Sequence, residues 1–385
     1  MKILVVLTYY RPHTSGLTIY ADRLANALIK RGHSVTVMTS RYMKELPTEE
    51  IIQGVRIVRA PVIFRLSKGV LMPTFGLLAT KLILEHDVIH LHLPQLDAAG
   101  VAIRGRLLKK PTIITYHCDL KMPMGLLSRL ANQAIHLMNN IAAIFSHQLV
   151  TYTQDYANYS PFLRRFKRKL KIIPPPVELP KISKVAIHNF MAEHCINGRF
   201  PIIGMAARFA SEKGVEVLLN ALPKIIKEYP NAIVWFAGPY KNIVGEEKYI
   251  KRLKPAIDQY AKQGYWKFVG TLSPEEMAAF YPNLNVLVIP SLNSTEAFGL
   301  VQIEAMMNSV PCVASDLPGV RQPVFHHKMG EVVPIADPEA LSQAILSVVK
   351  KKIMDKEPSC FLRYSPNMVA KEYELLFNSI KNKLN

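Results

Sequence analysis

Residues 294–316, STEAFGLVQIEAMMNSVPCVASD, are mostly apolar but carry two glutamates, Glu296 and Glu304, eight residues apart. A helix turns by about 100° per residue, so on a continuous helix the two side chains would point roughly 80° apart. The strand-like run NVLVIPS comes just before this segment, and a second one, VPCVAS, lies near its end. We therefore expect a loop that holds Glu296, followed by a helix that starts near Phe298 and carries Glu304 in its second turn.

Short runs rich in Val and Ile alternate along the chain with longer segments of helical period. Segments such as LTIYADRLANALIKRG separate KILVVLT, SVTVMTS, DVIHLHL and PTIITYH, and the alternation begins again with PIIGMAARF. Strands and helices in this rhythm predict parallel sheets that are covered by helices on both faces. The sequence therefore predicts an α/β fold built from two doubly wound units.

Two domains are also expected from the length of 385 residues, which exceeds the usual size of a single core. The proline-rich stretch IIPPPVELP cannot continue a helix or a central strand, and we place the hinge there. We predict domains at 1–175 and 176–362, and a terminal helical segment at 363–385. The apolar stripe of this last segment is expected to comprise Met368, Tyr373, Leu375, Leu376 and Ile380.

The chain is strongly basic, with 48 Lys and Arg against 29 Asp and Glu and a formal charge of +19. This balance favours an anionic partner: nucleotide phosphates, an acidic membrane surface or nucleic acid. The sequence contains no recognisable nucleic-acid recognition motif, so we expect no nucleic acid. In PFLRRFKRKLK, apolar residues recur at helical spacing among cations. This segment fits either a helix on an anionic bilayer or an ordinary solvated helix.

The spacing of the cysteines and the most apolar segments of the sequence indicate the cellular compartment of the protein. No C-x-x-C pair is present, so neither a zinc site nor a disulfide framework is indicated, and a reducing cytoplasm fits best. The apolar run at the amino terminus is too short for a signal peptide, and Pro73 and Lys81 interrupt VLMPTFGLLATKLIL. We expect a cytoplasmic chain that does not cross a membrane. The sequence is also compatible with a protein bound peripherally to the cytoplasmic face of a membrane.

Charged residues at the carboxyl ends of two predicted strands suggest a ligand site. Arg208 and Lys213 follow the strand in MAARFASEKG; Arg offers a planar fork to phosphate oxygens and Lys offers a point charge. Carboxylates only accept hydrogen bonds, so Glu296 and Glu304 suit sugar hydroxyls. Ligands of such sheets bind at their carboxyl edge, which predicts a site in a cleft between the two domains. The expected ligand combines a sugar, a diphosphate and a ribose.

Several segments together resemble a retaining glycosyltransferase of family 4 with the GT-B fold, over nearly the whole chain. They are EAFGLVQIE with the following AMMNSVPCVASDLPGV, ARFASEKG, NVLVIPS and the opening YYRPHTSGLTIYADRLANALIKRGHSVTV. The resemblance implies two Rossmann-like domains facing across a cleft. It assigns the acceptor to the first domain and the nucleotide sugar to the second. It also implies a carboxyl-terminal helix that crosses back onto the first domain.

The resemblance implies roles for the matching residues. Glu296 would bind hydroxyls of the donor sugar, Glu304 the ribose, and Arg208 with Lys213 the diphosphate. Further donor-binding positions are Gly16 in the first loop, the Gly270 to Leu272 segment near the base, and a turn whose amides assist the phosphates. The residues of that turn are Ala297, Phe298, Gly299 and Leu300.

A histidine at a strand end completes the implied site. His117 ends PTIITYH, and in similar enzymes a histidine there touches the donor sugar and the reaction centre. Together with Glu296, Arg208 and Lys213 it forms our set of catalytic candidates. His13 and Asp119 are placed on the acceptor side. His90 and His92 alternate on a strand and share one face, which we interpret as packing.

The implied reaction is transfer of a hexosyl group from a UDP-, GDP- or ADP-sugar to an acceptor hydroxyl with retention. The chain has no Asp-x-Asp pair, so no metal and no cofactor is expected. The amphipathic segment MGLLSRLANQAIHLMNNIAAIF favours a lipid-linked glycan acceptor of cell-envelope or extracellular polysaccharide synthesis. A small soluble acceptor, with this segment packed inside the first domain, and a nucleotide-sugar epimerase of the same fold remain alternatives.

Overall fold

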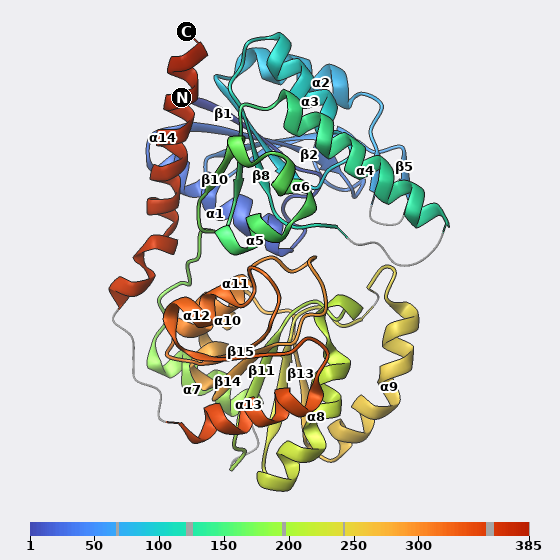
Figure 1. Cartoon of the computed structure of the whole chain (residues 1–385), viewed down its shortest axis with the longest axis vertical. Coiled ribbons are helices and arrows are strands. Elements are labelled where there is room, and N and C mark those ends of the chain that lie inside the picture. Colours follow the sequence, from blue (N-terminus) through green and yellow to red (C-terminus); the bar gives the residue numbers. More distant parts are fainter. Residues whose placement is uncertain (67–68, 121–125, 195–197, 242, 352–357, 385) are drawn as a thin grey trace. The chain divides into compact units, whose positions relative to one another are not determined.

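The computed structural model describes residues 1–66, 69–120, 126–194, 198–241, 243–351 and 358–384. Two compact units make up the chain (Figure 1): Met1–Val177 with Arg363–Asn385, and Glu178–Leu362. Each unit has its own parallel sheet with helices on it. The predicted α/β fold of two Rossmann-like units is confirmed, as is the return of the terminal helix to the first unit.

The first unit is built on an eight-stranded sheet of order β10-β9-β8-β7-β1-β2-β4-β3, parallel except for the β3–β4 pair. The strands β5 and β6 form a separate antiparallel pair. The strands are β1 (Lys2–Val6), β2 (Ser34–Arg41), β3 (Glu49–Ile52), β4 (Val55–Pro61), β5 (Phe64–Leu66), β6 (Gly69–Leu71), β7 (Val88–Leu93), β8 (Thr112–Tyr116), β9 (Gln148–Thr151) and β10 (Leu170–Ile172). The helices are α1 (Gly16–Lys30), α2 (Phe75–Glu85), α3 (Ala98–Leu107), α4 (Leu126–Phe145), α5 (Gln154–Tyr159), α6 (Pro161–Arg165), the 3₁₀ turn η1 (Lys167–Lys169) and α14 (Pro366–Leu384).

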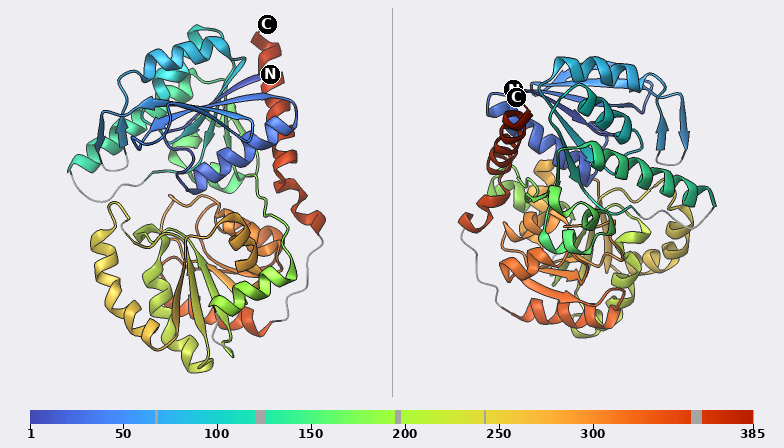
Figure 2. Two further views of the ribbon diagram at one scale, coloured as in Figure 1. Left: turned by 180° about the vertical axis from the view of Figure 1, so that it is seen from behind. Right: turned by 45° about the horizontal axis from the view of Figure 1, so that its top comes forward.

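The carboxyl-terminal helix α14 packs on α1 (Figure 2) and fixes the two ends of the chain together. The hydroxyl of Tyr373 is hydrogen-bonded to that of Tyr20 at 2.7 Å and to that of Thr115 at 2.6 Å. Arg31 Nε donates to Glu374 at 2.7 Å. The predicted apolar stripe is right for Tyr373, Leu376 and Ile380 but wrong for Met368 and Leu375, which are exposed. Val369, Ala370 and Phe377 are buried in their place.

The basic segment at residues 161–171 is not one helix, so the predicted helical continuation beyond Arg165 is wrong. The chain forms α6, then η1, and then enters the sheet as β10, where Leu170 pairs with Leu149 of β9. Phe162 is buried and stacks on Tyr116 with ring centroids 4.3 Å apart. Pairing with the sheet edge therefore overrides the helical spacing of the apolar residues.

The second unit has a six-stranded parallel sheet of order β13-β12-β11-β14-β15-β16. Its strands are β11 (Ile202–Ala206), β12 (Ile233–Ala237), β13 (Trp266–Gly270), β14 (Val286–Ile289), β15 (Cys312–Ser315) and β16 (Gly330–Val333). The helices are α7 (Lys184–His194), α8 (Val215–Glu228), α9 (Glu247–Lys262), α10 (Pro274–Phe280), α11 (Leu300–Met306), α12 (Gln322–His327) and α13 (Pro338–Lys350), with 3₁₀ turns η2 (Ser211–Lys213) and η3 (Tyr281–Asn283). The 3₁₀ segment η4 (Pro358–Tyr364) spans the boundary between the two units. The strand order reverses between β11 and β14, and ligands of such sheets bind beyond the carboxyl ends of the strands at this point.

Three histidine rings lie together on one buried face of the first sheet. His90 and His92 belong to β7, and His117 follows β8. Tyr20 of α1 and Tyr373 of α14 lie against these rings. Burial lowers the pKa of all three: that of His92 falls to about 3, and those of His90 and His117 fall well below their usual value. All three histidines are therefore neutral in the folded protein near pH 7.

The free energy of unfolding should fall as the pH is lowered from 7 to 5. Unfolded histidines take up protons near pH 6.5 while these folded ones do not, so their stabilising effect is complete above that pH and is lost below it. Each histidine contributes up to about 1.4 kcal/mol per pH unit. Urea unfolding at several pH values measures this slope. His90→Gln should reduce it, and His188→Gln, at an exposed position of α7, is the matched control. A slope that His90→Gln leaves unchanged would contradict the assignment.

Candidate active site

Two loops of the second unit meet where its strand order reverses. The loop after β11 carries Arg208 and ends with Lys213, and the next residue, Gly214, has a φ of +69°. A Cβ on Gly214 would lie 1.9 Å from the carbonyl oxygen of Pro290, in the loop after β14. The amide of Leu292 also donates to the carbonyl of Glu212 at 2.9 Å. Only glycine fits at position 214, and the two loops are held together by their main chains.

The ion pair between Lys213 and Glu296 joins the same two loops through side chains. Lys213 Nζ donates to Glu296 Oε2 at 2.5 Å, and the two side chains are 22% and 18% exposed. Burial acts to lower the pKa of Lys213, but the charge of Glu296 and its hydrogen bond outweigh this effect, and the pKa is raised. Lys213 is therefore a cation at neutral pH. The structure thus brings together two residues that lie 83 positions apart in the sequence.

Arg208 lies in the same loop and is paired with a nearby carboxylate. Its guanidinium donates to Glu212 at 2.5 Å, and its side chain is 32% exposed. Glu246, which is buried, accepts a hydrogen bond from the amide of Ser211 at 3.0 Å and so holds the middle of the loop. Sequence reasoning did not find Glu246, because nothing in its local pattern separates it from the surface glutamates around it.

The second glutamate, Glu304, is presented by α11. This helix begins after Gly299, whose φ is +77°, and it places Glu304 in its second turn, as the spacing predicts. Glu304 is 6% exposed and accepts a hydrogen bond from the hydroxyl of Tyr281 at 2.6 Å. Tyr281 is a positioning residue that the sequence did not indicate, since it lies in a different segment from Glu304.

The remaining donor-site candidates occupy several positions. Ala297, Phe298 and Gly299 are buried in the turn before α11, and Leu300 is its first residue. Gly270 ends β13, and its carbonyl accepts from the amide of Gly238 at 2.7 Å. Leu272 is half-buried two residues later. Within the described ranges, no hydrogen bond or ion pair joins Gly270 or Leu272 to the Lys213–Glu296 pair, so their role at the base stays a prediction.

The first unit carries the other predicted residues. Gly16 is the first residue of α1, behind the capping hydroxyl of Ser15, and no atom lies within 4 Å of a Cβ built there. His13 stacks on Tyr9 with ring centroids 4.9 Å apart. Asp119 is 8% exposed, and its Oδ1 accepts from the hydroxyls of Tyr116 and Ser160, each at 2.8 Å. That these residues meet those of the second unit across a cleft stays a prediction.

His117 is 7% exposed, and other side chains bond to both of its ring nitrogens. Nδ1 is hydrogen-bonded to the hydroxyl of Tyr152, and Nε2 to Nδ1 of His92 at 2.8 Å. Its position at the carboxyl end of β8 matches the expectation, since its amide donates to Leu93 at the end of β7 at 2.9 Å. The bond to His92 differs from the sequence-based expectation, which assigns His92 to packing.

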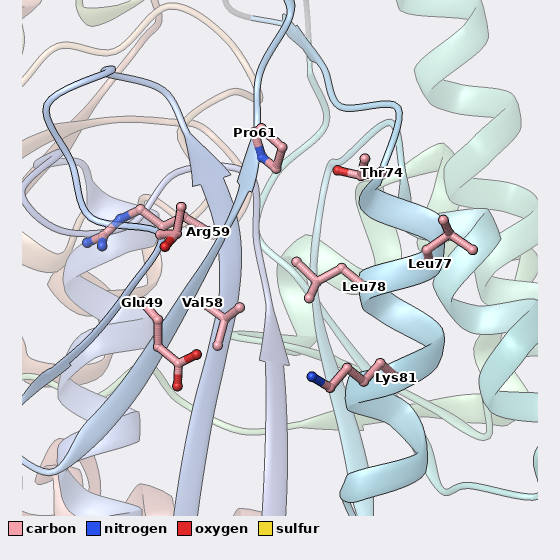
Figure 3. Close-up of a pocket in the computed structure, with 9 residues that line it drawn as sticks. Glu49, Val58, Arg59, Pro61, Thr74, Leu77, Leu78 and Lys81 are labelled. Carbon is pink, nitrogen blue, oxygen red and sulfur yellow. The ribbon is translucent and has the colours of Figure 1, made fainter.

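A depression of about 410 Å³ lies elsewhere in the first unit, between the edge of the sheet and α2 (Figure 3). Glu49, Val58 and Pro61 line it on the strand side, and Leu77 and Lys81 on the helix side. None of the predicted site residues lines this depression. We therefore do not assign it to the predicted reaction.

Comparisons with known proteins bear on the family. The model "Glycosyltransferase Family 4" matches residues 14–180, and the model "Glycosyl transferases group 1" matches residues 187–360. An uncharacterized glycosyltransferase of Methanocaldococcus jannaschii is 25% identical over 393 residues, covering 97% of this chain and 96% of that protein. The phosphatidyl-myo-inositol mannosyltransferase of Mycolicibacterium smegmatis is 22% identical, covering 91% of this chain and 85% of that protein.

Solved structures share the fold over the whole length. HepE of Anabaena, in complex with UDP and glucose, superposes with a TM-score of 0.74 at 16% identity and covers 98% of this chain and 100% of its own. Sucrose-phosphate synthase of Thermosynechococcus elongatus superposes with a TM-score of 0.68 at 20% identity and covers 100% of this chain and 97% of its own. With one family model on each half, in order along the sequence, and the GT-B architecture common to these structures, the chain belongs to the family 4 glycosyltransferases.

Proposed function

We propose that the chain transfers a hexosyl group from a nucleoside diphosphate sugar to an acceptor hydroxyl, with retention at the anomeric carbon and without a metal ion. The observation that carries this proposal is the Lys213–Glu296 pair at the carboxyl edge of the second sheet. There a cation suited to a diphosphate lies beside a carboxylate suited to sugar hydroxyls. The matched family and the UDP complex of HepE agree with such a donor.

In the proposed reaction, Lys213 and Arg208 stabilise the leaving diphosphate. Lys213 has three N–H donors and Arg208 has five. Each cation bonds to one carboxylate, Glu296 or Glu212, so donors remain for phosphate oxygens. Negative charge grows on the diphosphate as the glycosidic bond breaks. A fixed cation aimed at that charge contributes about 3 kcal/mol, roughly a hundredfold in rate. Glu296 and Glu304 orient the sugar and the ribose.

Donor binding and turnover test the proposal directly. Calorimetry with UDP-, GDP- and ADP-sugars should identify a bound donor class, and Lys213→Ala should lower kcat about a hundredfold. Lys224→Ala, which breaks the exposed Lys224–Glu339 pair on α8, is the matched control and should leave kcat unchanged. The anomeric configuration of the first-formed product, read by proton NMR, tests retention. Absence of binding to every donor, or full activity of Lys213→Ala, would refute the proposal.

Activity should survive the removal of divalent metal. Arg208 and Lys213 supply the positive charge that a metal ion provides in other sugar transferases, so the rate in EDTA should equal the rate in added Mg²⁺. The measurement is the initial rate after dialysis against EDTA, with and without Mg²⁺ or Mn²⁺ added back. A rate that EDTA abolishes and the metal restores would show that the cations alone do not suffice.

The acceptor that we propose is a lipid-linked glycan held at an anionic membrane, in cell-envelope or extracellular polysaccharide synthesis. Leu130, Leu137 and Ile144 recur every seven residues on α4, and they are 56%, 57% and 59% exposed. Seven residues are close to two helical turns, so these three side chains form one apolar stripe. The relative in Mycolicibacterium smegmatis is named a phosphatidyl-myo-inositol mannosyltransferase. A lipid acceptor in that protein supports a lipid-linked acceptor here.

Cations lie beside this stripe. Arg165 donates to Asn140 of α4 at 3.3 Å, and Lys169 Nζ donates to the carbonyls of Ala143 and Ile144 at the end of the same helix. Arg164, Arg165 and Lys167 also line a shallow depression. An apolar stripe flanked by Lys and Arg is the pattern of a surface that lies in the interface of an anionic bilayer. Within the described ranges no helix has both the length and the apolar character of a membrane span.

Vesicle sedimentation tests the membrane contact. The chain should pellet with vesicles of phosphatidylglycerol and phosphatidylcholine but much less with phosphatidylcholine alone. Each Lys or Arg near the surface adds about 1 kcal/mol, so Arg164→Ala with Arg165→Ala should weaken binding roughly 30-fold. Leu137→Gln should also reduce binding, whereas Leu375→Gln, at an equally exposed position of α14, should not. Equal binding to both vesicle types would favour the soluble acceptor.

A further inference from the structure

The ring of His117 is held on three sides by residues of the first unit. Its two nitrogens are bonded to Tyr152 and His92. It also lies against the His92 ring, with centroids 5.1 Å apart and planes inclined by 23°. Tyr20 approaches it edge to face at 5.0 Å. The ring therefore cannot rotate without breaking both hydrogen bonds.

The parallel sheet produces this arrangement. His92 of β7 pairs in register with Thr115 of β8, so His117, two residues further on, lies on the same face beyond the strand end. Thr115 in turn pairs with Val150 of β9, which places Tyr152 beside His117 on that face. The contacts of His117 thus come from the neighbouring strands on both sides of β8.

Proton positions in this group are coupled. Between two neutral imidazoles, one nitrogen must donate and the other accept. If His117 Nε2 donates to His92, its Nδ1 accepts from the hydroxyl of Tyr152. If His92 Nδ1 donates instead, His117 Nδ1 donates to that hydroxyl. Either way, the tautomer of His92 determines the tautomer of His117.

Among the described residues, the imidazole of His92 has no other hydrogen bond. Its second nitrogen, Nε2, is buried and lacks a hydrogen-bond partner in the described part of the chain. A buried polar atom without a partner destabilises the folded state. Within the described ranges, the bond to His117 is therefore the polar contact that offsets burial of the His92 imidazole. Burial also lowers the pKa of both residues, which keeps the pair uncharged.

We propose that His92 is a positioning residue that holds the His117 ring in a single orientation and couples the tautomer of His117 to its own. This rests on the proposed function and on the role that the family resemblance implies for His117, which is contact with the donor sugar at the reaction centre. A displacement of about 1 Å in such a group can lower the rate about a hundredfold. His92 would thus act on the reaction only through His117.

Nitrogen-15 NMR of histidine-labelled protein tests the bond without reference to activity. In the wild type, the Nε2 signal of His117, assigned by its loss in His117→Gln, should have the chemical shift of a hydrogen-bonded imidazole nitrogen. In His92→Leu, where Nε2 loses its partner, this signal should move. A wild-type Nε2 signal without a hydrogen-bond shift, or an unchanged Nε2 signal in His92→Leu, would overturn the proposal. If His92→Leu does not fold, the wild-type spectrum and that of His92→Asn give the same test.

Kinetics test the consequence for the reaction. His92→Leu should lower kcat about 10- to 100-fold with little change in KM for the donor. His92→Asn, which keeps a polar atom near the position of Nδ1, should recover part of that loss. His90→Leu is the matched control, because His90 is buried on the same strand face but bonds to Thr115. An equal loss of kcat in His90→Leu would mean that packing alone is responsible.

The two experiments separate this inference from the proposed function. If the wild type transfers no sugar from any donor, the proposed function fails, while the NMR result on the His92–His117 bond still stands.

Discussion

The arrangement of the candidate site depends on the contact between the loops that follow β11 and β14. Gly214 lets the main chain of the first loop pass against Pro290 of the second, and Lys213 and Glu296 close the contact with an ion pair. A partly exposed pair of this kind adds little net stability, about 0–1 kcal/mol. The main-chain contact is therefore what holds the loops together. The ion pair sets where a positive and a negative group are presented at the edge of the sheet.

Most of the fold could be predicted from local sequence patterns. The strand runs, the loop with Glu296 and the helix with Glu304 depend on hydrophobic periodicity and on the residues that start a helix, which are local properties. The prediction was wrong for the basic segment, where Leu170 joins the sheet edge. That outcome depends on a partner strand, β9, that the spacing of residues 161–171 cannot reveal.

The parts of the site that could not be predicted share one cause. Tyr281 positions Glu304, Glu246 holds the loop that carries Arg208, and His92 bonds to His117, each from a separate segment of the chain. Such contacts exist only once the sheet has formed, because the register of neighbouring strands determines which side chains meet. His92 looked like packing since it lies on a fully buried strand, and it is indeed buried. Its hydrogen bond becomes visible only with the position of the adjacent strand.

The first unit is made from both ends of the chain, and this affects how the protein assembles on the ribosome. Residues 1–177 emerge before residues 178–362, but α14, which covers α1 and bonds to Tyr20 and Thr115 through Tyr373, is translated after both. The second unit, residues 178–362, is complete before then. Domains usually fold in the order in which they are synthesised. Here the apolar face of α1 must remain without its cover while the nascent chain grows, so of the two units the one that emerges earlier is completed later.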